Sequence, residues 1–106
     1  MLKHPARAAA IALVFCFTSL NGFAQNSGAD TYKTKCEVCH GTDGLGTQVG
    51  KSMAVRPYNA PDVLKLSDAN LTAIIKNGKN KMPAFTGKLT DAQIKDLLAY
   101  IHRLQK

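Results

Sequence analysis

Residues 36–40 read Cys36-Glu37-Val38-Cys39-His40, and this C-x-x-C-H run is the most informative stretch of the chain. Two cysteines three positions apart occupy adjacent positions on a helical turn, so both thiols can reach one flat ligand. A histidine directly after them can turn beneath that ligand and bind a metal at its centre. The pattern is typical of c-type haem attachment, in which each thiol bonds to a haem vinyl group and the histidine binds iron.

Two other uses of the C-x-x-C pair compete with haem attachment. A redox dithiol of the thioredoxin type lies beside a βαβ pattern, and no alternating strand pattern occurs in this chain. A structural zinc ion needs four ligands, for which His102 is the only other candidate. Cys39 and His40 are also adjacent and would strain to share one tetrahedral ion. The sequence therefore favours haem over both alternatives.

The segments around this run have helical periodicity and glycine-rich connections, which predicts an all-α domain. We expect a first helix over 27–39, a loop through residues 41–58, and a short helix that starts at Pro61. Ser67 is placed to cap the next helix, which Gly78 ends. Thr90-Asp91-Ala92-Gln93 is a capping box that opens the last helix. The core stripe of that helix is expected to comprise Ile94, Leu97, Leu98, Ile101 and Leu104. The expected architecture is about four helices and loops wrapped around one haem.

Residues 1–24 have the features of an export signal peptide. Lys3 and Arg7 provide its positive start, residues 8–17 form an apolar run, and small residues near Ala24 suit cleavage after that position. The alternative is an uncleaved anchor, but the run is shorter than the roughly 18 to 20 apolar residues that span a membrane. We therefore expect a periplasmic protein whose domain covers residues 25–106, with no stable membrane insertion.

The composition narrows the function classes. A chain of 106 residues allows one domain, and 14 basic against 7 acidic residues give a formal charge of +7, or +5 without the leader. The lysines are scattered and aromatic residues are few, so nucleic-acid binding is not supported. A domain this small commonly relies on a staple, metal or cofactor, and a monomer is the default expectation.

A second iron ligand is expected on a loop. Pro83 pushes Met82 out of the helical region into an extended conformation, from which its thioether could reach the iron opposite His40. Met53 is a rival ligand on the earlier loop, and Met82 could also simply fill a gap in the core. His102 is expected at the surface or boundary of the last helix rather than at the metal.

Residues 26–106 together resemble a small bacterial class I cytochrome c with one haem. Lys81-Met82-Pro83-Ala84-Phe85 resembles the sixth-ligand loop of that family. Gly28 and Tyr32 stand where the family places a glycine and an aromatic residue before the haem motif, and Leu97 and Tyr100 match the partner positions on the last helix. The resemblance implies one covalent haem c, with Cys36 and Cys39 as thioether donors and His40 and Met82 as axial iron ligands. It also favours Met82 over Met53.

One feature departs from the family pattern. Members commonly have a proline about a dozen residues after the ligating histidine, and its carbonyl orients the imidazole. This chain has Lys51-Ser52-Met53 in that region, and the first proline after His40 is Pro57. We expect some other carbonyl to hold the second ring nitrogen of His40. Tyr58 could contact a haem propionate or have a packing role.

Ligation by His40 and Met82 would leave iron no open position, which indicates a soluble one-electron carrier and not an enzyme. The alternative from another class is a haem enzyme or gas sensor in which Met82 is displaced. Redox proteins with an acidic docking face are the expected partners. The basic residues that would meet them are Lys76, Lys79 and Lys81, with Lys51 and Lys88 as possible neighbours. The competing interpretation is a generic solvated surface.

Overall fold

The computed structural model describes residues 22–106. Residues 1–21, which include most of the predicted leader, lie outside the described residues. The helices are α1 (Gly22–Lys35), α2 (Glu37–His40), α3 (Gln48–Ser52), α4 (Pro61–Leu64), α5 (Asp68–Asn77) and α6 (Asp91–Leu104). Extended pairing in the described range is limited to two isolated bridges, at Lys79–Met82 and Thr86–Leu89. The prediction of an all-α domain is confirmed.

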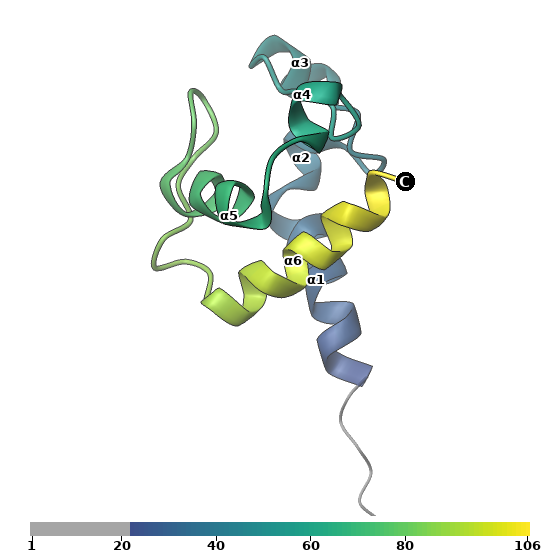
Figure 1. Cartoon of the computed structure of the whole chain (residues 1–106). Helices are drawn as coiled ribbons and strands as arrows, with labels where there is room; N and C mark the ends of the chain where they lie inside the picture. The colour runs from purple at the N-terminus through teal and green to yellow at the C-terminus, as the bar shows by residue number, and fades with distance from the viewer. Residues whose placement is uncertain (1–21) are drawn as a thin grey trace, which may run out of the picture.

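The first and last long helices cross closely, as Figure 1 shows for α1 and α6. Gly28 makes this crossing possible, because a Cβ atom at this position would lie only 2.4 Å from the carbonyl oxygen of Asp96. The rings of Tyr32 and Tyr100 pack beside the crossing with their centroids 5.0 Å apart. The positions that match the family pattern, Gly28, Tyr32 and Tyr100, therefore lie together at this crossing.

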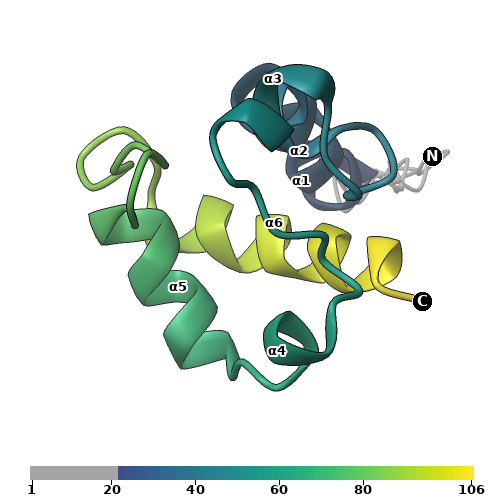
Figure 2. The same ribbon diagram turned by 90° about the horizontal axis from the view of Figure 1, so that it is seen from above.

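The apolar core lies where α6 meets α1 and α5. Tyr32, Ile94 and Leu97 are each about 1% exposed, and Ile75 of α5 joins them. Within the predicted stripe of α6, the residues through Ile101 are buried and Leu104 is partly buried against the same cluster. Figure 2 shows α5 and α4 on one side of α6, with α1, α2 and α3 on the other.

The predicted helix ends agree with the structure. Ser67 and Thr90 each accept a hydrogen bond from a backbone N–H at the third helical position, and both form reciprocal capping boxes. Pro61 occupies the first turn of α4, and Gly78 ends α5 with a positive φ of 75°.

Two expectations about the N-terminal half were wrong. The first helix covers Gly22–Lys35 instead of 27–39. It ends before Cys36 because the φ of this residue is −119°, far from the helical value of about −63°. The segment 41–58, expected to be a loop, contains α3. Its N-cap is Thr47, whose side chain accepts a hydrogen bond from the N–H of Gly50. No helix within residues 22–106 combines the length and apolarity needed to cross a membrane.

Candidate functional site

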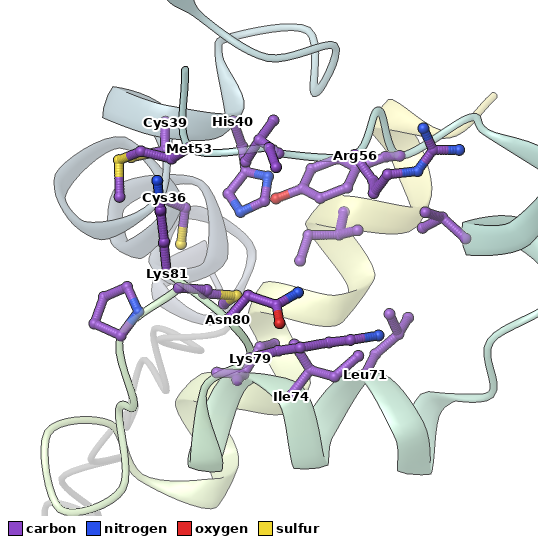
Figure 3. A pocket seen from close by; sticks show the side chains of 18 of the residues that line it. Cys36, Cys39, His40, Met53, Arg56, Leu71, Ile74, Lys79, Asn80 and Lys81 are labelled. Carbon is purple, nitrogen blue, oxygen red and sulfur yellow. The ribbon is translucent and has the colours of Figure 1, made fainter. Parts of the chain in front are cut away.

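A cavity of about 500 Å³ opens between α2, the segment 53–58, α5 and the loop 79–83. All four predicted site residues line it, namely Cys36, Cys39, His40 and Met82. Figure 3 shows the side chains that surround it. Most of the lining is apolar, with Val63, Leu71, Ile74 and Phe85 among its residues. Binding cavities for cofactor-sized molecules usually measure roughly 300 to 1,000 Å³, so this one is large enough.

The segment that ends α2 is held by backbone groups of the following loop. The N–H of Gly46 donates to the carbonyl of His40 at 2.8 Å, and the N–H of Thr47 donates to that of Cys39 at 3.0 Å. The Thr47 hydroxyl donates to the carbonyl of Val38 at 2.7 Å. These bonds satisfy carbonyls that such a short helix leaves without partners of its own. They therefore fix the backbone from which Cys39 and His40 extend.

Both cysteines of the motif are free thiols. Cys36 is buried at 9% exposed, and burial raises the pKa of its thiol to about 11. Cys39 is partly exposed at the cavity. Figure 3 shows the two side chains at the same end of the cavity.

The His40 ring is packed rather than hydrogen-bonded. Its Nδ1 is buried and has no hydrogen-bond partner in the described part of the chain, so the expected carbonyl contact is wrong for this structure. The ring stacks on Tyr58 with centroids 4.8 Å apart and planes inclined by 20°. Burial lowers the pKa of His40, which favours the neutral imidazole that binds metals.

Met82 lies on a tight turn beneath the end of α5. The N–H of Met82 donates to the carbonyl of Lys79 at 2.9 Å, and the N–H of Lys79 donates back at 3.2 Å. Asn80 has a positive φ of 53°, a conformation that Asn tolerates better than most residues. Gly78 leaves room for the turn, since a Cβ atom there would lie 2.6 Å from the carbonyl oxygen of Met82. The Met82 side chain is half-buried against the core.

Charged side chains at the cavity are mostly basic. Lys35, Lys79 and Lys81 line it, together with Arg56 and Asp62, which form a two-bond ion pair at 2.6 and 3.2 Å. This contact raises the pKa of Arg56 and lowers that of Asp62. Figure 3 shows Arg56 at the end of the cavity far from Cys36 and Cys39. Arg56 was not predicted as a site residue, and the only signal in the sequence is its position directly before Pro57 and Tyr58.

The expected group of lysines is divided in the structure. Lys79 and Lys81 are exposed at the cavity mouth, whereas the Lys76 ammonium pairs with Asp91 at 2.7 Å. Lys76 is therefore a poor member of a positive rim, because its charge is already matched by a carboxylate.

The residues present fit a c-type haem. Two free thiols at one end of an apolar cavity suit thioether attachment, and His40 nitrogen and Met82 sulfur are suitable iron donors. Arg56 lies at the end far from the cysteines, where its guanidinium, although paired with Asp62, has further N–H groups that could donate to a cofactor's carboxylates. In residues 22–106, no three His, Cys, Asp or Glu side chains are grouped to hold a metal ion, which counts against the zinc alternative.

The fold and the site together fit a small helical haem-binding domain. Comparisons with known proteins identify the family to which it belongs. Residues 23–101 match the family profile described as cytochrome c oxidase, cbb3-type, subunit III. Cytochrome c6 of Synechococcus elongatus is 33% identical over 75 residues, which cover 71% of this chain and 84% of that protein. Subunit CcoP of the cbb3-type cytochrome c oxidase of Azospirillum brasilense is 35% identical over 89 residues, but only 30% of its length is matched. The solved KustC0563 c-type cytochrome superposes with a TM-score of 0.69 at 30% identity, covering 74% of this chain and 98% of that one.

The chain therefore belongs to the monohaem class I cytochrome c family. Members of this family are electron-transfer proteins rather than enzymes, and the family's cofactor is haem c. The family resemblance stated from the residues is confirmed.

Proposed function

We propose that this protein is a soluble periplasmic electron carrier whose haem is bonded to Cys36 and Cys39 and whose iron is bound by His40 and Met82. The observation that carries the proposal is the single cavity that brings these four side chains together from two distant parts of the chain. When bound, haem supplies a reversible one-electron couple. The predicted leader over residues 1–24 supports the proposed location.

The arrangement of the cavity supports Met82 as the second axial ligand. His40 and Met53 lie along the same side of the cavity in Figure 3, and Asn80 and Lys81, which directly precede Met82, lie across from them. A ligand opposite His40 must come from the facing side. Met82 is on the turn that forms that side, whereas Met53 would have to cross from the side of His40.

The chain's own residues would adapt this site to electron transfer. Donors from both sides would occupy both axial positions and leave none for a substrate. The stiff turn at Lys79–Met82 and the bonded backbone of α2 would keep both donors in place in either oxidation state. The apolar lining would disfavour the additional positive charge of the oxidised form of a bound haem and so would raise its reduction potential.

Covalent attachment is tested by expressing the full chain in a bacterial host that attaches haem in the periplasm. The proposal expects a purified protein heavier by one haem, with the haem retained after denaturation. Cys36→Ala and Cys39→Ala should each reduce covalent attachment, with Thr42→Ala as an exposed control near the motif. Haem that denaturation releases from the unaltered protein would contradict the proposal.

We further propose that the partner is a redox protein with an acidic docking face. Val38 is 66% exposed, and it lines the cavity together with the basic residues Lys35, Lys79 and Lys81. An apolar centre with a basic rim suits a complementary acidic surface and speeds encounter by attraction. Lys51 and Lys88 are exposed outside this group, and Lys76 is paired with Asp91.

The docking proposal is tested with the rate of electron transfer to an acidic redox protein as ionic strength increases. Charge attraction predicts a steep decline in rate with added salt, because surface charges are screened within about 10 Å at 0.1 M. The double variant Lys79→Gln/Lys81→Gln should weaken this dependence more than the double variant Lys95→Gln/Lys106→Gln, which removes two exposed lysines on and just after α6. Equal effects of the two changes would favour a generic basic surface.

A further inference from the structure

A chain of polar side chains connects three distant segments behind the His40 side of the cavity. The Asp68 carboxylate lies 2.6 Å from His102 Nε2, and His102 Nδ1 lies 2.8 Å from Gln105 Oε1. The Gln105 amide nitrogen then donates to the carbonyl oxygen of Tyr58 at 3.1 Å. The start of α5 and the end of α6 are thereby joined to the segment before α4.

The hydrogen bonds from Asp68 to Tyr58 have a consistent order of donors and acceptors. The Gln105 amide nitrogen faces a carbonyl, so its oxygen is turned toward His102 and accepts. A protonated His102 can therefore donate to the carboxylate and to the amide oxygen at once. The pKa of His102 is correspondingly raised, first by the hydrogen bond to Asp68 and then by that to Gln105. His102, expected only at the surface, thus fixes the orientation of the Gln105 amide.

Tyr58 at the inner end of the chain is held on both of its backbone groups. Its N–H donates to the carbonyl of Gly44 at 3.0 Å, and its carbonyl accepts from Gln105. The side chain is buried, with its ring against the His40 imidazole. Two backbone bonds therefore fix the main chain of Tyr58, one of them from the end of α6, and the ring itself also packs against Tyr32 with centroids 6.3 Å apart.

The imidazole of His40 needs such support, because Nδ1 has no hydrogen-bond partner among the described residues. Ligating histidines usually donate this N–H to a carbonyl or carboxylate, which fixes the orientation of the ring. In this chain the stacked Tyr58 ring is the contact that restrains rotation of His40 about its side-chain bonds.

We propose that Gln105 is a positioning residue for the iron ligand His40: it holds Tyr58 from the outside, while His102 and Asp68 hold its amide. This inference rests on the proposed role of His40 as an iron ligand. Half-exposed pairs of this kind add little to stability. We therefore expect the effect of these hydrogen bonds in the properties of the site more than in the stability of the protein.

The test uses the haem-loaded full chain with Gln105→Ala, Gln105→Glu and Lys106→Gln. Gln105→Glu keeps an oxygen toward His102 but removes the donor to Tyr58, and Lys106→Gln changes the adjacent exposed residue only. The readouts are the reduction potential and the proton NMR shifts of the haem methyl groups in the oxidised protein, which respond to the orientation of the axial imidazole.

Both Gln105 variants are expected to redistribute the methyl shifts and to change the oxidised-to-reduced equilibrium two- to tenfold, which is about 18 to 59 mV for one electron. Lys106→Gln should leave both unchanged. If the Gln105 variants match the unaltered protein in shifts and potential, even with reduced stability, the proposal is overturned. Gln105→Glu provides the test if Gln105→Ala does not fold. A wild-type protein that lacks covalent low-spin haem would instead overturn the proposed function.

Discussion

The glycine at position 50 offers the sharpest test of how the haem motif is held. Gly50 lies in α3, and a Cβ atom there would lie 2.0 Å from the carbonyl oxygen of Cys39. Real Cβ atoms essentially never approach within 3.0 Å, so Gly50→Ala must move α3 from α2 by about 1 Å or more. The obstacle is backbone, which cannot turn aside as a flexible side chain would.

The magnitude follows from the contacts that this movement disturbs. Overpacking costs about 1 to 3 kcal/mol, and weakening the two bonds from Thr47 to the carbonyls of Val38 and Cys39 costs about 1 kcal/mol each. Alanine improves helix propensity by about 1 kcal/mol, which offsets part of the loss. We therefore expect Gly50→Ala to lower the free energy of unfolding by about 2 to 4 kcal/mol.

The assay is urea unfolding of the haem-loaded protein, followed by absorbance and circular dichroism. Gln48→Ala is the matched control, because it is an exposed position of the same helix and should change stability by less than about 0.5 kcal/mol. A Gly50→Ala protein as stable as the unaltered chain would refute the reasoning, since it would mean that α3 does not pack on Cys39 as described.

Three further predictions follow from other parts of the fold. Gly28→Ala should lower the free energy of unfolding by about 1 to 3 kcal/mol in the same assay, because its Cβ atom would meet the Asp96 carbonyl. Ala54→Gly should raise thermal stability by about 0.5 kcal/mol, because Ala54 has a positive φ of 61° and relief of this strain exceeds the added chain entropy. The contact of His102 with Asp68 stabilises the unaltered protein in full below about pH 6.5, and this stabilisation is lost as pH rises through the raised pKa of His102. Asp68→Asn should remove it, which is measured by unfolding both proteins at a series of pH values.

A specific result would contradict each of these predictions. Unchanged stability of Gly28→Ala would mean that α1 and α6 can separate without loss. For Ala54→Gly the control is Ala99→Gly, which lies in α6 with no such strain and should be destabilised by about 1 kcal/mol. A similar loss at both alanines would show that Ala54 is not strained. A stability difference between Asp68→Asn and the unaltered protein that stays constant with pH would show that His102 does not titrate through this contact.

Much of the fold could be predicted from local sequence signals. Ser67, Thr90, Pro61 and Gly78 act within a turn of their own positions, so their patterns determine where helices begin and end. The stripe in α6 was predictable because helical periodicity alone selects the buried face. The helix α3 was not predicted, because Gly46 and Gly50 near Thr47 suggest a loop and the helix depends on capping by a single hydroxyl, that of Thr47.

Contacts between distant segments were not predictable in the same way. The pairing of Lys76 with Asp91 and the chain from Asp68 to Tyr58 depend on how α5 and α6 pack, and no periodicity encodes such pairs. Nor could the sequence predict that the buried Nδ1 of His40 has no hydrogen-bond partner within residues 22–106. The four proposed site residues could be named because one motif and one family resemblance mark them. The thioether roles of Cys36 and Cys39 and the axial roles of His40 and Met82 stay predictions.

The most direct test of the central claim is the visible absorption spectrum of the haem-loaded protein, oxidised and reduced, compared with Met82→Ala and Met53→Ala. Ligation by His40 and Met82 predicts covalent low-spin haem in the unaltered protein, conversion to high-spin in Met82→Ala, and an unchanged low-spin spectrum in Met53→Ala. A high-spin spectrum in the unaltered protein, or conversion by Met53→Ala alone, would contradict His40–Met82 ligation. The first of these results would point instead to a haem enzyme or gas sensor with an open iron position.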